Sequence, residues 1–145
     1  NELIIPSNVE RVWIIAHSMG GSYTCSFISK NPQWCIEHLS AFALTDGIEP
    51  TIHAKGFLLN KWSHLKGINW IRSNEPLNKQ LADGSSLQHR SAETNDHPLT
   101  THTAFPFIWE FFDENGANSD KSPELTETFI GDDENSLIDN YCFIA

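Results

Sequence analysis

Residues 12–21 have the sequence VWIIAHSMGG, and this stretch decides the fold that we expect. Its first four residues are β-branched or aromatic, which is typical of a strand covered on both faces, and they end abruptly in a polar turn. The two glycines that follow allow a helix to start close against the strand. The pattern differs from the nucleophile elbow Gly-x-Ser-x-Gly only by Ala16 at its first position. It therefore predicts Ser18 at the tip of a turn between a strand and a helix.

The chain around this elbow alternates between strand and helix patterns. The expected strands are at 11–16, 38–45 and 68–73, with a short fourth strand opening at 91–94, and the expected helices are at 22–30 and 53–66. A last helix is expected to begin with Thr103 as its cap and Pro106 in its first turn, and to end at Phe112. This alternation predicts an α/β fold with a doubly wound, mostly parallel sheet. The elbow makes that sheet similar to the α/β-hydrolase fold, of which we expect this chain to carry the C-terminal half.

The acidic residues are concentrated at the end of the chain. Of the 145 residues, 39% are hydrophobic and five are tryptophan, which favours one folded unit. Residues 1–112 contain ten acidic and eight basic residues, whereas 113–145 contain nine acidic residues and one lysine. We therefore expect a domain at 1–112 and an acidic tail at 113–145 that is disordered or loosely attached. Since the chain starts at Asn1, just before its best strand, we also expect it to be a segment of a longer protein.

Several classes of function are disfavoured by the composition. No run of eighteen apolar residues and no signal peptide is present, so we expect no membrane association. The net charge of −10 and the absence of a basic stripe argue against direct nucleic-acid binding. Three cysteines without a C-x-x-C pair fit reduced thiols in an intracellular protein. Neither a zinc-binding motif nor a glycine-rich phosphate loop is present, so we expect no metal and no cofactor.

A serine-type site is the chemistry that these residues favour. Ser18 is the candidate nucleophile, and the backbone amide of Met19 is a candidate oxyanion donor. His97 lies in a polar loop before the last helix, where the base of such a site is expected. Its acidic partner is open between Asp46, after the second strand, and Glu75, in the turn after the third. The structural alternative is that these are ordinary turn and loop residues.

Five segments together resemble one family. They are AHSMGG at 16–21, ALTD at 43–46, NWIRSNEPL at 69–77, HPLT at 97–100 and AFPFIWEFF at 104–112. In these segments, and over about residues 9–112, the chain resembles the Argonaute-binding-protein-two (Arb-two) domain and the animal cotranscriptional regulators that contain it. It differs at Met19, where the family has an aromatic residue, at Glu93, where it has glycine, and at Pro98, where it has an acidic residue.

This resemblance implies an α/β-hydrolase-like fold and a role beside Argonaute proteins in small-RNA silencing, heterochromatin or alternative splicing. It implies Argonaute, chromatin or splicing proteins as partners and a location that is nuclear or also cytoplasmic. Ser18, His97, Asp46 and Glu75 match the family's serine, histidine and two acids. Two functions remain open: a regulatory interaction domain that retains a hydrolase scaffold, and an active serine hydrolase, an esterase or thioesterase, for a small acyl substrate. A third, simpler possibility is an incomplete half-domain with an exposed sheet edge.

Overall fold

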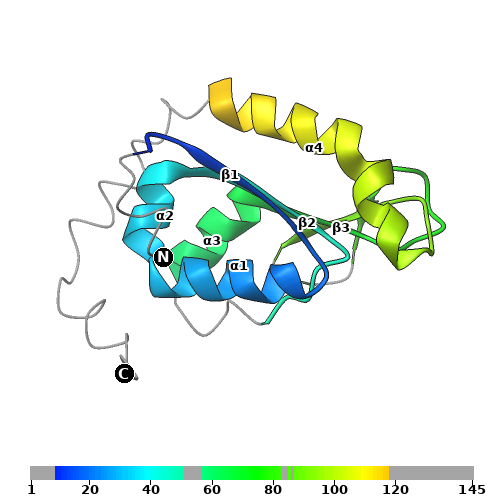
Figure 1. Cartoon of the computed structure of the whole chain (residues 1–145), viewed down its shortest axis with the longest axis horizontal. Helices are drawn as coiled ribbons and strands as arrows, with labels where there is room; N and C mark the ends of the chain where they lie inside the picture. Colours follow the sequence, from blue (N-terminus) through cyan, green and yellow to red (C-terminus); the bar gives the residue numbers. More distant parts are fainter. Residues whose placement is uncertain (1–8, 51–56, 83–84, 86, 118–145) are drawn as a thin grey trace.

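The structure is a computed structural model, and it describes residues 9–50, 57–82, 85 and 87–117 (Figure 1). Its elements are β1 (Val12–His17), α1 (Met19–Lys30), α2 (Pro32–His38), β2 (Leu39–Thr45), α3 (Phe57–Lys66), β3 (Gly67–Ile71), β4 (Gln80–Leu81), β5 (Gln88–Ser91), a 3₁₀ helix (His97–Leu99) and α4 (Thr100–Ala117). Within the described residues, no helix is both long and apolar enough to cross a membrane.

The described strands form one sheet with the order β1-β2-β3-β5-β4. β1, β2, β3 and β5 run parallel, and only the two-residue strand β4 is antiparallel to its neighbour. Helices cover both faces, with α1, α2 and α3 on one side and α4 on the other (Figure 1). The predicted α/β fold with a mostly parallel sheet is therefore confirmed.

The central strand β2 shows how its sequence separates the two faces. Every residue of β2 is buried, as expected of a strand covered on both faces, and small and large side chains alternate from Ala41 to Leu44. Phe42 and Leu44 belong to the core beneath α1, α2 and α3, whereas Ala41 and Ala43 belong to the core beneath α4. Gly67 at the start of β3 makes room for the Phe42 ring, because a Cβ there would overlap it. The small alanines leave room for the aromatic residues of α4 to pack against the sheet.

The first half of the chain follows the predicted order with two differences. α1 begins at Met19, directly after Ser18, three residues earlier than expected. α2 was not predicted, because Asn31-Pro32 was interpreted only as a helix stop. Proline is favoured in the first turn of a helix, where its missing N–H would have no acceptor, and Pro32 starts α2 in this way. Residues 53–56 of the helix predicted at 53–66 lie outside the described residues.

The second half departs further from expectation. β5 occupies Gln88–Ser91 and ends where the short strand was predicted to begin, and β4 was not predicted. The last helix starts at Thr100 instead of after Thr103, so Pro106 lies inside it and removes one helical hydrogen bond. α4 also continues to Ala117, which places residues 113–117 in the helix and not in the expected tail. The rest of that segment, residues 118–145, lies outside the described residues.

Candidate functional site

Ser18 occupies a strained turn between β1 and α1. Its φ of 54° and ψ of −120° are uncommon for a residue with a side chain, and such conformations cost about 1–3 kcal/mol. Backbone hydrogen bonds hold the turn: the Ser18 amide donates to the Thr45 carbonyl at 3.2 Å, and the Ser18 carbonyl accepts from the amides of Gly21 and Ile48, both at 3.0 Å. The predicted strand, turn and helix order around Ser18 is therefore present.

The second elbow glycine allows α1 to pass close to the loop after β2. A Cβ on Gly21 would lie 2.8 Å from the Ile48 carbonyl oxygen and 3.0 Å from the Gly47 Cα. Neither neighbour is a flexible side chain that could move aside. Glycine is needed here because two backbones cross, and this crossing holds the loop that starts at Asp46 against the elbow.

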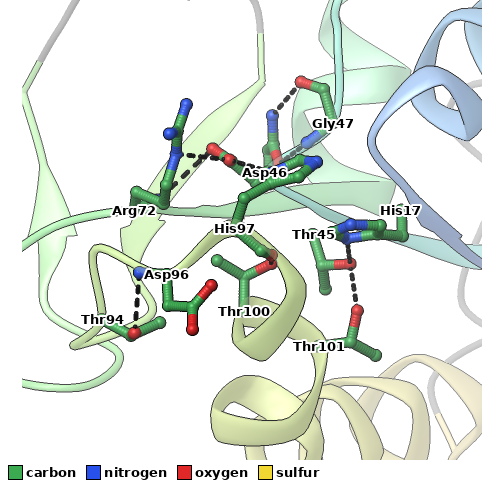
Figure 2. A network of polar contacts seen from close by, with 11 residues as sticks. His17, Thr45, Asp46, Gly47, Arg72, Thr94, Asp96, His97, Thr100 and Thr101 are labelled. Carbon is green, nitrogen blue, oxygen red and sulfur yellow. Dashed lines mark hydrogen bonds and ion pairs between the residues drawn. The ribbon is translucent and has the colours of Figure 1, made fainter.

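Asp46 and His97 form a pair at the carboxyl end of β2 (Figure 2). The Nδ1–H of His97 donates to Asp46 Oδ2 at 2.5 Å. The Asp46 side chain is 13% exposed, and its backbone also has a positive φ, 45°. Its amide donates to the Trp70 carbonyl of β3 at 2.7 Å, which fixes the position of the carboxylate. The fold thus brings together two residues that are 51 positions apart.

Arg72 shares the Asp46 carboxylate with His97. Its Nε lies 2.6 Å from Oδ2, the same oxygen that accepts from the imidazole, and its backbone amide donates to Oδ1 at 3.4 Å. No sequence pattern points to Arg72, because its place beside Asp46, one residue after β3, depends on the assembled sheet. The guanidinium is 54% exposed, so its contribution to holding the carboxylate is reduced by solvent.

Glu75, the other candidate acid, does not contact His97 in the structure. Its carboxylate pairs with Lys79 Nζ at 2.5 Å, and both side chains are about half exposed. Its backbone carbonyl accepts a hydrogen bond from Ser91 Oγ at 2.7 Å, which ties the turn at 74–77 to β5. Of the two acids that the sequence left open, Asp46 is therefore the one positioned to orient His97.

His17 lies against His97 from the end of β1 (Figure 2). The two ring centroids are 4.4 Å apart, with the ring planes inclined at 37°. His17 Nδ1 is 3.2 Å from Thr45 Oγ1, which is in turn 2.6 Å from Thr101 Oγ1. A chain of polar contacts from β1 through β2 to α4 thus holds the His17 ring beside the candidate base.

The residues of a serine-type site are present, but Ser18 and His97 are not hydrogen-bonded to each other. Within the described residues, no hydrogen bond joins Ser18 Oγ to His97. Because Asp46 accepts from Nδ1, Nε2 is the nitrogen left to accept a proton, as a base in such a site requires. Such contacts often close only when substrate binds. Met19 is the first residue of α1, so its amide has no acceptor within the helix.

A second buried polar cluster, which was not predicted, supports the loop that carries Asp46. Glu49 Oε1 accepts from Asn69 Nδ2 at 2.6 Å and lies 2.6 Å from His89 Nε2. Asn69 also bonds both backbone groups of Gly47, at 2.9 and 3.1 Å. The Glu49 and His89 side chains are only 11% and 14% exposed. Because these partners come from a loop, β3 and β5, no local sequence pattern could have connected them.

The described residues include no group of three or more histidine, cysteine or acidic residues that could hold a metal ion. Cys25 and Cys35 are free and buried, and Cys142 lies outside the described residues. Burial raises the pKa of the Cys25 thiol to about 11, with the nearby charge of Glu49 adding to the shift, and burial alone raises the pKa of Cys35 to about 12. Neither thiol therefore has the character of a nucleophile at neutral pH.

Comparison with known proteins identifies relatives of this chain by sequence. The chain is 29% identical to cotranscriptional regulator ARB2A of Mus musculus over 130 residues, which are 87% of this chain and 31% of the relative. It is 30% identical to the ARB2A homologue of Gallus gallus over the same shares of each protein. The chain thus spans about a third of the length of these relatives.

No solved structure matches the chain. The model of the Arb2 domain matches residues 1–77, a range that includes the elbow, Asp46, Arg72 and Glu75. The two relatives are both cotranscriptional regulators by name, in agreement with this match. The chain therefore belongs to the Arb2 domain family.

Proposed function

We propose that this chain acts in cotranscriptional regulation as an interaction domain, in nuclear complexes linked to Argonaute proteins. The observation that carries the proposal is the family: the Arb2 domain match and relatives named as cotranscriptional regulators. Silencing, heterochromatin formation and alternative splicing are the processes in which such complexes act. The partners are Argonaute, chromatin or splicing proteins, and the domain is nuclear with a cytoplasmic fraction.

The state of the site agrees with binding as the main activity. Ser18 Oγ has no hydrogen bond to His97, and the Asp46 carboxylate is shared between His97 and Arg72. In this proposal, an α/β-hydrolase-like scaffold keeps the elbow and the Asp46–His97 pair because they fix neighbouring strand ends and the loop after β2. The strain at Ser18 and Asp46 is then offset by the surrounding hydrogen bonds.

Direct binding to purified Argonaute proteins tests this proposal. The full 145-residue chain is immobilised, and binding of Argonaute is followed by biolayer interferometry. The Ser18→Ala variant serves as the matched comparison, because it removes the candidate nucleophile but no described hydrogen bond of the side chain. Saturable binding that Ser18→Ala changes by less than about twofold, well under 1 kcal/mol, supports an interaction domain. Absence of saturable binding by the wild-type chain would contradict the proposal.

A second candidate function is hydrolysis of a small ester or thioester. The Asp46–His97 pair favours it, because an acid on Nδ1 leaves Nε2 free to activate a serine hydroxyl. In that mechanism, Ser18 attacks the acyl carbonyl, His97 takes the hydroxyl proton, and the Met19 amide donates to the oxyanion. The C–O or C–S bond to the leaving group then breaks, and His97 gives its proton to the departing alcohol or thiol, which leaves the acyl group on Ser18. Water then releases the acyl group as a carboxylic acid. Covalent labelling of Ser18 by a fluorophosphonate distinguishes this function from binding alone.

A further inference from the structure

Lys66 places an amine between the two helical layers of the fold. It is the last residue of α3, and β3 begins at the next residue, Gly67, without an intervening loop. α3 and α4 pack on opposite faces of the sheet (Figure 1). The Lys66 side chain nevertheless reaches α4, where Nζ donates to Asn115 Oδ1 at 3.2 Å. Because Lys66 directly precedes a parallel strand, it lies at the amino ends of the strands, opposite to the Asp46–His97 pair at their carboxyl ends.

Contacts at the end of α4 fix the position of Asn115. Its side-chain amide donates to the Phe111 carbonyl at 3.0 Å, which leaves Oδ1 facing Lys66 Nζ. The carbonyl of the next residue, Gly116, accepts a hydrogen bond from Arg11 Nη1 at 2.9 Å, so the end of the helix is also tied to the residue before β1. The fold therefore holds a neutral amide oxygen, and not a carboxylate, against the amine.

The surroundings of this amine disfavour its charged form. Lys66 is half-buried, and both Ile68, two residues further, and Phe111, one helical turn before Asn115, belong to the core beneath α4. Within the described residues, the amine has no ion pair with a carboxylate that would offset this burial. Desolvation by burial therefore lowers the pKa of the Lys66 amine below its usual range. A larger fraction of the amine is then neutral at physiological pH, and the neutral amine is the nucleophilic form.

We propose that Lys66 is a modification site, whose amine takes up the acyl group of a small acyl thioester. The neutral Nζ attacks the thioester carbonyl and forms a C–N bond, while the C–S bond breaks. The electron pair of the C–S bond leaves with the thiolate, which takes up the proton that Nζ loses. Thioesters suit this amine better than oxygen esters, because a thiolate is a better leaving group than an alkoxide. The products are an amide on Lys66 and a free thiol, and the reaction requires neither Ser18 nor a bound partner.

Competitive acylation of the native 145-residue chain tests the proposal. The chain is treated with the thioacetate of N-acetylcysteamine, a small neutral acetyl thioester, and initial rates of acetylation at each lysine are measured by peptide mass spectrometry. Lys61, an exposed lysine on α3, is the internal reference. At about pH 7.5, Lys66 should be acetylated at least about threefold faster than Lys61. This ratio should fall by at least about threefold at about pH 10.5, where an ordinary lysine is about half neutral.

Asn115 provides a matched pair of variants. Asn115→Asp places a carboxylate of the same size against Nζ and favours the charged amine, so acetylation of Lys66 at about pH 7.5 should slow by at least about threefold. Asn115→Ala removes the contact without adding a charge and should not slow it. Lys61 should react alike in all three chains, and circular dichroism checks that they keep the same fold.

Three results would each overturn the proposal. The first is that Lys66 reacts no faster than Lys61 at about pH 7.5. The second is a ratio of the two rates that is the same at both pH values, because accessibility and not the neutral amine would then set the rate. The third is that Asn115→Asp leaves Lys66 unchanged, or that both variants slow it alike.

Discussion

Replacing Asp46 by asparagine tests whether this acid, and not Glu75, organises the candidate site. Asparagine keeps the size of the side chain and tolerates the positive φ of 45° at least as well as aspartate, so the substitution removes mainly the charge. Asp46 Oδ2 loses its charge-assisted contacts with His97 Nδ1 at 2.5 Å and Arg72 Nε at 2.6 Å.

The expected cost follows from the exposure of these partners. A hydrogen bond to a charged group contributes about 1.5–3 kcal/mol when shielded, but the exposed ion pair with Arg72 contributes only about 0–1 kcal/mol. His97 is 37% exposed, and asparagine can still accept one hydrogen bond. Asp46→Asn should therefore lower the free energy of unfolding by about 1–2 kcal/mol. Glu75→Gln, which removes an exposed ion pair with Lys79, should cost less than about 0.5 kcal/mol.

Urea unfolding followed by tryptophan fluorescence measures both variants under the same conditions. A companion NMR measurement follows exchange of the Nδ1–H proton of His97 with solvent, which should be slow in the wild type and in Glu75→Gln and faster in Asp46→Asn, where the acceptor has lost its charge. The reasoning is refuted if Asp46→Asn unfolds at the same urea concentration as the wild type. It is equally refuted if Glu75→Gln costs as much as Asp46→Asn.

Three further predictions concern stability. Ser63 is fully buried and its hydroxyl has no partner, so Ser63→Ala should raise the free energy of unfolding by about 1 kcal/mol in urea titrations. Glu93 has a φ of 51°, a conformation that glycine adopts without strain, so Glu93→Gly should raise the melting temperature, with a net gain of about 0.5 kcal/mol; a lower melting temperature would contradict this expected relief of strain. Because burial raises the pKa values of Cys25 and Cys35 to about 11 and about 12, the folded state keeps protons that the unfolded thiols release from pH 9 upward. Stability should thus fall above pH 9, by about 1.4 kcal/mol per pH unit for each thiol, and Cys35→Ala should reduce that slope.

Local apolar patterns predicted the part of the fold that surrounds the elbow. β1, β2 and β3 are strands of continuous or nearly continuous apolar residues, and their order along the chain places their carboxyl ends at one edge of a parallel sheet. This was sufficient to expect Ser18 and Asp46 at neighbouring strand ends. His97 was also expected just before the last helix, and it lies there. This prediction needed only the order of elements along the chain, not the contacts between them.

The strand β5, most of which was missed, is held by polar contacts, which leave no apolar period. β5 has the sequence QHRS, and each of its side chains makes a specific hydrogen bond instead of packing in a core. Those partners lie 12 to 40 residues away, so only the assembled fold connects them. The same holds for Arg72 on Asp46 and for Glu49 with Asn69, and it explains why the sequence alone left two acids open.

Fluorophosphonate labelling of Ser18 tests most directly whether the site binds or catalyses. The native 145-residue chain and its Ser18→Ala variant are treated with the reagent, and intact mass is measured beside an active serine hydrolase that is fully modified under the same conditions. If the chain acts only as an interaction domain, no more than a small fraction of it should be modified. Stoichiometric modification of the wild-type chain, absent in Ser18→Ala, would contradict binding as its main activity and establish a reactive serine.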